Sequence, residues 1–157
     1  MSPRDAAVGL LLAAFDEAFD RPSWHGPNLR GSIRGLTPAR AARRPGRGRH
    51  NIQEVVVHCA YWKYAVWRLL TRARRGTFEL DGTNWFPRPR ADARLLRADI
   101  ELLARWHREL RQAITALPPG AVRKQVKSRV SVADVIRGAT AHDLYHAGQI
   151  QLIKRLT

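Results

Sequence analysis

The last long segment of the chain, residues 131–156, reads SVADVIRGATAHDLYHAGQIQLIKRL. Its apolar side chains recur every three or four residues, the spacing that brings side chains to one face of an α-helix. That face contains Val135, Ala139, His142, His146, Ile150 and Ile153. Ser131 and Asp134 form a capping-box pattern, which predicts the start of the helix. The segment therefore predicts a long amphipathic helix with two histidines on its buried face.

Three segments upstream have the same helical spacing, and each is bounded by a helix start or stop signal. They are Pro3–Phe19, capped by Ser2, Ile52–Arg74, capped by Asn51, and Asp92–Leu117, stopped by Pro118. Four long helices with longer connections between them are typical of a four-helix bundle. The chain has 157 residues, enough for one buried core but not for two. We therefore predict an all-α fold, a four-helix bundle with long interhelical loops, in a single domain spanning residues 1–157.

The connections between these helices contain turn-forming residues. Asn28 is expected to cap a short helical piece after the first helix. Residues 77–90 contain a glycine and two prolines, so we expect a loop there, pinned to the body by Trp85 and Phe86. Residues 121–130 alternate between basic residues and valine, and the pattern leaves open whether they are extended or a loop.

Composition indicates a globular protein. Hydrophobic residues make up 45% and charged residues 26%, whereas a disordered chain would have fewer apolar residues. Cys59 is the single cysteine, which excludes an intramolecular disulfide and a multi-cysteine zinc site. No apolar run approaches the ~18 residues that a membrane helix needs. We therefore expect a cytoplasmic protein without membrane contact.

The two histidines of the last helix have the spacing of metal ligands. His142 and His146 lie four residues apart, so they share a face and are separated by ~6 Å of helical rise. Imidazoles on that face can converge on one ion at Zn–N distances of ~2.0–2.1 Å. His58 lies on the inward stripe of the second helix, which makes it a candidate third ligand. Such a site would leave coordination positions open for water or substrate.

Two other interpretations of these histidines stay open. A buried helical histidine is often a hydrogen-bonded core residue, so the three could serve only structure or assembly in a non-catalytic bundle. A zinc-protease motif would need Glu directly after the first histidine, and Asp143 stands there instead. The residues after His146 include no further ligand, so any third protein ligand must come from upstream.

Two motifs resemble those of a known family. His58-Cys-Ala-Tyr-Trp-Lys-Tyr and Ala141-His-Asp-Leu-Tyr-His-Ala-Gly-Gln-Ile150 are similar to motifs of the DinB/YfiT-like superfamily. The similarity covers nearly the whole chain. It implies a four-helix bundle, often dimeric, with a divalent metal held by His58, His142 and His146. Relatives include metal-dependent thiol S-transferases that use bacillithiol or glutathione, and a mycothiol-dependent isomerase.

A three-histidine metal site suggests a reaction class. The metal can lower the pKa of a bound water to ~7 or bind a thiol as the reactive thiolate. The leading hypothesis is metal-dependent transfer or addition of a low-molecular-weight thiol to a small-molecule electrophile, and hydrolysis is the sibling reaction. Three imidazoles suit transition metals and disfavour Mg²⁺ or Ca²⁺. We expect the bound metal to be zinc, with nickel as the second candidate. We also expect the protein to form a homodimer.

Several other residues are assigned provisional roles. The candidates for catalytic or positioning roles are His25, Asp143, Tyr145 and Gln149. A salt bridge to an arginine is the alternative for Asp143, which points ~100° away from its neighbour His142. Trp62 is expected in the core, where it could also form a wall of the pocket. Cys59 is expected to be a buried, inert thiol. His107 is expected to face solvent or a partner.

A nucleic-acid-binding protein is the competing class. The net charge is +15, and no acidic residue occurs between Asp20 and Glu54. That stretch contains Arg30, Arg34, Arg40, Arg43, Arg44, Arg47 and Arg49. Such a surface could neutralise several phosphates. No zinc-finger spacing, RNP-type motif or convincing helix-turn-helix accompanies it, so this function is the weaker alternative.

Overall fold

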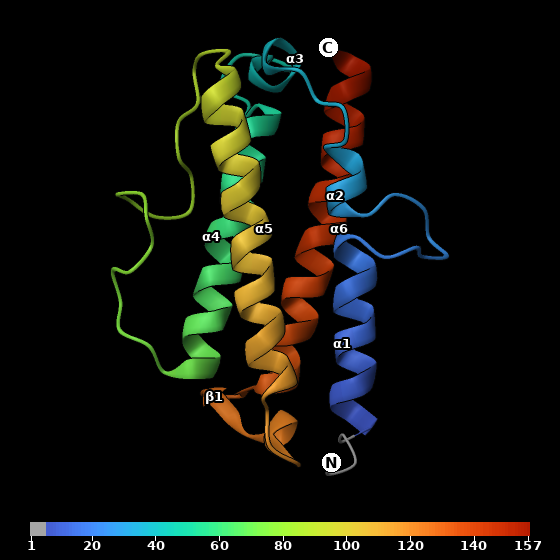
Figure 1. Cartoon of the computed structure of the whole chain (residues 1–157), viewed down its shortest axis with the longest axis vertical. Coiled ribbons are helices and arrows are strands. Elements are labelled where there is room, and N and C mark those ends of the chain that lie inside the picture. The colour runs from blue at the N-terminus through green and yellow to red at the C-terminus, as the bar shows by residue number, and fades with distance from the viewer. Residues whose placement is uncertain (1–5) are drawn as a thin grey trace.

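Four long helices run along the same axis in the computed structural model, which describes residues 6–157 (Figure 1). They are α1 (Ala6–Phe19), α4 (Ile52–Thr71), α5 (Ala93–Thr115) and α6 (Val132–Leu156). The prediction of an all-α bundle is confirmed. The predicted cap at Ser2 and the first turn at Pro3 lie outside the described residues.

Two short helices lie between α1 and α4 in the sequence. α2 (Leu29–Ser32) lies above α1 and packs against α6, and α3 (Pro38–Ala42) lies at the end of the bundle near the C-terminus (Figure 1). The side chain of Asn28 accepts a hydrogen bond from the Gly31 N–H, which confirms the predicted cap. The pair α1–α2 thus covers a length of α6 that α1 alone would leave open.

Helices α4 and α6 begin where their caps predict. In α4 the Asn51 side chain accepts from the Glu54 N–H while the Glu54 carboxylate accepts from the Asn51 N–H, and Ser131 and Asp134 form the same box at α6. The end of α4 was predicted too late. Arg72 adopts a left-handed conformation (φ 58°), which stops the helix at Thr71 rather than at Arg74.

A small hairpin closes the end of the bundle where α6 begins (Figure 1). After a 3₁₀ turn, η1 (Ala121–Arg123), β1 (Gln125–Lys127) pairs antiparallel with β2 (Val130–Ser131). Within residues 121–130 the extended alternative is therefore correct for Gln125–Lys127 and Val130, whereas 121–123 form the 3₁₀ turn.

The basic stretch before α4 is partly used inside the molecule. Arg40 donates to the carbonyl of Lys154 at 2.6 Å, and Arg43 donates to the carbonyl of Thr157. The last carbonyls of a helix lack intrahelical partners and carry partial negative charge, so cations stabilise them. These arginines fasten the α3 segment to the end of α6. Within residues 6–157, no helix has the length and apolarity needed to span a bilayer.

His107 does not face solvent, contrary to the sequence-based expectation. Its ring stacks on Phe15 and Phe19 of α1, with centroid distances of 4.5 and 3.7 Å, and its exposed fraction is 4%. Burial, then the nearby charges of Lys63 and Arg111, lower the pKa of His107 to about 2. The helical period of α5 shows which of its faces is apolar, but α1 supplies the two rings that enclose this histidine.

The buried imidazole makes stability depend on pH. Below the ordinary histidine pKa of 6.5, the unfolded chain takes up a proton that folded His107 does not, so stability falls as pH falls below 6.5. We expect His107→Phe to lose less unfolding free energy than the wild type between pH 6.5 and 4, measured by urea unfolding. His25→Gln, which changes an exposed loop residue, should keep the wild-type slope. Equal slopes for all three proteins would contradict the neutral, buried His107.

Candidate metal centre

Three imidazoles from α4 and α6 converge on one point inside the bundle. The Nε2 atom of His142 lies 3.1 Å from the Nε2 of His58 and 3.1 Å from the Nε2 of His146. His58 and His146 are buried, and His142 is half-buried. The helical spacing accounts for the pair on α6, and the packing of α4 on α6 brings His58 to it.

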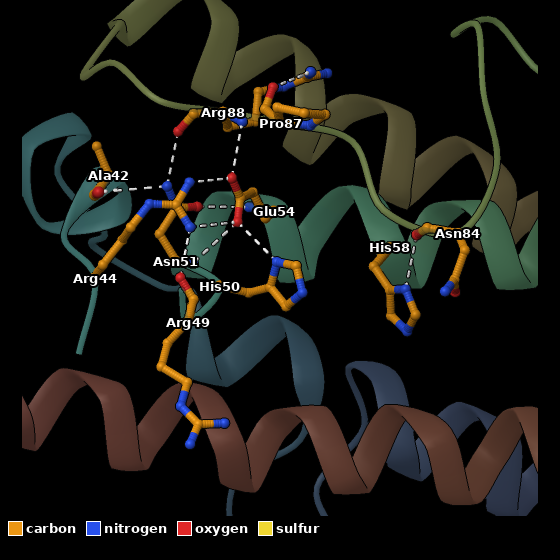
Figure 2. Close-up of polar contacts among 10 residues, drawn as sticks. All are labelled: Ala42, Arg44, Arg49, His50, Asn51, Glu54, His58, Asn84, Pro87 and Arg88. Carbon is orange, nitrogen blue, oxygen red and sulfur yellow. Dashed lines mark hydrogen bonds and ion pairs between the residues drawn. The ribbon is translucent and has the colours of Figure 1, made fainter. Parts of the chain in front are cut away.

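The ring of His58 is oriented by the loop between α4 and α5. Its Nδ1–H donates to the backbone carbonyl of Asn84 at 2.8 Å (Figure 2). Trp85 stacks on the ring at a centroid distance of 3.9 Å. Asn84 has a left-handed backbone (φ 64°), which asparagine tolerates better than most residues. Its side-chain oxygen accepts from the Trp62 indole at 2.9 Å. One loop residue thus fixes both His58 and Trp62.

The ring of His146 is oriented from its own helix. Its Nδ1 lies 2.7 Å from the Oε1 of Gln149, one turn further along α6. A carbonyl or amide oxygen can only accept, so Nδ1 carries the proton in both His58 and His146. The Nε2 atoms of these two neutral rings are therefore bare and face the Nε2 of His142.

This donor arrangement fits a metal ion. His142 has one proton to offer, so it cannot properly satisfy two bare nitrogens, whereas a cation at the centre satisfies all three. Zn–N bonds of ~2.0–2.1 Å in tetrahedral geometry separate ligand nitrogens by about 3.3 Å, close to the spacing found here. The three histidines could therefore hold a metal ion.

Burial keeps the three rings neutral. Desolvation, followed by the charges of His146 and His58, lowers the pKa of His142 to about 3. Desolvation also lowers the pKa of His146 to about 4, and it lowers the pKa of His58. In both rings the hydrogen bond at Nδ1 favours the charged form, but the effect of burial is larger. Neutral imidazole is the form that binds metals.

A second group, Cys59, His142 and Asp143, also has ligand atoms within 4.8 Å of one another. The thiol of Cys59 is fully buried, and desolvation raises its pKa, which disfavours the thiolate that metals bind. Asp143 is ion-paired with Lys63, and both side chains are buried. The second group is therefore the poorer metal site, and Cys59 is buried as expected.

The other candidates separate into residues near the cluster and residues away from it. Gln149 contacts His146. The exposed ring of Tyr145 packs against the same histidine, with a distance of 5.0 Å between the ring centroids. His25 is exposed in the loop between α1 and α2, and it does not belong to the group of histidines that converge in the described part of the chain. Asp143 pairs with a lysine rather than an arginine. Trp62 is not a core residue, because 42% of it is exposed.

Glu54 anchors the loop that reaches His58. Its carboxylate accepts hydrogen bonds from the Arg44 guanidinium, the Arg88 backbone N–H at 3.1 Å and the His50 ring at 3.0 Å (Figure 2). Asn51 adds a bond from its amide to the Arg88 carbonyl at 2.7 Å. Burial alone would raise the pKa of Glu54, but the bonds from Arg44, Arg88 and His50 lower it to about 2.

A second contact holds the same loop from the side of α5. The Arg88 guanidinium binds both carboxylate oxygens of Asp99 at 2.7 and 2.9 Å, and the Gln53 amide donates to Asp99 at 2.7 Å. Asp99 interrupts the apolar stripe of α5. A carboxylate at a buried position predicts that a polar or charged side chain binds it there. Nothing local in the sequence indicated that Asn84 and Trp85 reach His58.

The fold and the cluster define a helical bundle with a candidate three-histidine metal centre. A family model described as the DinB superfamily matches residues 21–150. The chain therefore belongs to the DinB superfamily. No match was found among curated proteins, and none among solved structures.

The loop anchor can be tested with Glu54→Gln, which keeps the size of the side chain and removes its charge. At pH 7 the loss of charge-assisted hydrogen bonds should lower the free energy of unfolding by about 2 kcal/mol. The carboxyl pKa is about 2 in the folded chain against an ordinary 4.5, so its stabilisation is present above 4.5 and lost as pH falls toward 2.

The difference between wild type and Glu54→Gln should therefore shrink below pH 4.5 in urea-unfolding measurements. Glu17→Gln, at an exposed position of α1, is the matched control and should change little. A Glu54→Gln protein as stable as wild type at pH 7 would show that this carboxylate does not anchor the loop.

Proposed function

We propose that this chain is a metal-dependent enzyme that transfers or adds a low-molecular-weight thiol to a small-molecule electrophile. His58, His142 and His146 would hold the metal. The observation that carries the proposal is the convergence of three Nε2 atoms, two of them bare because their Nδ1 protons are already donated. Membership of the DinB superfamily supports the same ligand set.

When bound, the metal would act as a Lewis acid that lowers the pKa of a coordinated thiol or water. The protein's own groups orient the ligands: Asn84 through its carbonyl and Gln149 through its amide oxygen. Such partners raise ligand basicity and fix the tautomer. Trp85 covers one face of His58 and restricts the access of water to that side.

The carboxylates nearest the three histidines offer little general-base help for hydrolysis. Hydrolysis benefits from a general base that takes a proton from water. Asp143, next to His142, is ion-paired with Lys63, and Glu54 is held by Arg44 and Arg88. Both carboxylates are thus paired with cations, and the remaining oxygen of Asp143, Oδ1, is buried. A free thiol, with an ordinary pKa of about 8.5, loses its proton more readily than free water does, and a metal that lowers the pKa of bound water to ~7 would narrow that difference.

The proposed reaction balances without an added oxidant or reductant. The sulfur forms a bond to an electrophilic carbon of the substrate. In transfer, the bond from that carbon to a leaving group breaks, the group departs with the electron pair, and the thiol proton is released. In the addition reaction nothing leaves the substrate, and the thiol proton is transferred to it. Zinc is the first expectation for the metal and nickel the second, since three neutral imidazoles suit both.

Thiol consumption tests the proposal. Zinc- or nickel-loaded protein is incubated with glutathione, bacillithiol or mycothiol and a panel of alkyl and unsaturated electrophiles, and adducts are measured by mass spectrometry. We expect metal-stimulated adduct formation with at least one thiol. His142→Ala should abolish it, and His25→Ala should retain it.

The non-catalytic alternative predicts a different outcome. If the three histidines serve only structure, His58→Ala lowers the melting temperature while no thiol reacts under any metal condition. Absence of metal-stimulated turnover with all three thiols would contradict the proposal. The homodimer, the cytoplasmic location and the single domain expected from the sequence stay predictions.

A further inference from the structure

A mostly apolar groove lies beside the candidate metal centre, between α4 and α6. Its volume is about 310 Å³. The apolar side chains that line it are Trp62, Val66, Leu69, Val130, Val135 and Ala139. The β1–β2 hairpin closes one end, and His142 lies in the lining. Because His142 also belongs to the imidazole cluster, the groove and the cluster share a residue.

The groove is held open by the structure rather than by chance side-chain positions. Trp62 forms one wall although 42% of it is exposed, and its indole is fixed by the hydrogen bond to Asn84. Gly138 also lines the groove, and it lies inside α6, where glycine is an unfavourable helix residue. A Cβ at Gly138 would meet no atom within 4 Å. A side chain at position 138 would therefore extend into open space at the wall of the groove.

The polar groups of the lining indicate the charge of an occupant. Lys63 and Asp143 neutralise each other in a buried ion pair. Lys127 is exposed in the lining, and no carboxylate among residues 6–157 forms a salt bridge with it. The groove thus offers an apolar surface with one uncompensated positive charge, which matches an apolar molecule carrying an anionic group.

We infer that this groove binds the electrophilic substrate, and that this substrate has an aliphatic or aromatic body with a negatively charged group directed toward Lys127. The inference rests on the proposed function, because it assigns the groove to the acceptor of the thiol. It adds the substrate class: compact apolar anions rather than sugars, nucleotides or cationic amines.

The test uses 4-phenylbutyrate as the probe and isothermal titration calorimetry as the readout, on zinc-loaded protein. We expect wild type to bind 4-phenylbutyrate more tightly than the neutral 4-phenylbutanol, and Lys127→Gln to remove that preference. Gly138→Leu should fill the groove and weaken binding of both probes by about tenfold or more. Gly148→Leu is the matched control, since Gly148 is also exposed on α6 with no atom near a built Cβ and does not line the groove.

The outcomes separate this inference from the proposed function. Wild type that holds zinc but binds neither probe overturns the inference and leaves the metal proposal standing. Wild type that binds the probes but holds no zinc overturns the metal proposal and supports the groove. Equal affinities for wild type and Gly138→Leu, or equal losses in Gly138→Leu and Gly148→Leu, overturn the inference.

A second copy of the chain is the competing occupant of the groove. Sedimentation of wild type and Gly138→Leu at matched concentrations addresses it directly. If Gly138→Leu dissociates a wild-type dimer, the groove is covered by another protomer and the inference is wrong. If the two proteins sediment alike while only Gly138→Leu loses the probe, the substrate assignment is supported.

Discussion

The site depends on the direction in which two imidazole protons point. Both His58 and His146 donate their Nδ1 proton to an oxygen, at 2.8 and 2.7 Å, and so turn an unprotonated Nε2 toward His142. Desolvation inside the bundle lowers the pKa of each ring, so the rings stay neutral near pH 7. Protonation therefore does not relieve the repulsion between the nitrogen lone pairs that face one another. A cation bound between the three nitrogens would satisfy their lone pairs.

The rest of the fold supports that orientation from two sides. Gln149 is fixed by its place on α6, but Asn84 belongs to a long loop that has no regular structure of its own. Contacts from Glu54, Asn51 and Asp99 to Arg88 tie the end of this loop to α4 and α5. The buried polar network at the start of α4 therefore supports the orientation of His58 through the loop.

Local signals in the sequence predicted the helices and the clustering of the three histidines. The boxes Asn51/Glu54 and Ser131/Asp134 marked the starts of α4 and α6, and helical spacing placed His142 and His146 on one buried face. Contacts between distant segments were not predictable. The pairing of Lys63 with Asp143 and the stacking of α1 aromatics on His107 depend on how the helices pack. Trp62 follows the apolar period of α4, yet it is partly exposed because it borders a groove.

The metal content of the purified protein tests the central claim most directly. The protein is prepared without a nickel column, exchanged into buffer with equimolar zinc and nickel, desalted and analysed by elemental mass spectrometry, alongside His142→Ala and His25→Ala. We predict about one ion per chain for wild type and His25→Ala, and almost none for His142→Ala. Equal metal content in wild type and His142→Ala, or none in either, would contradict the account of three imidazoles sharing one ion.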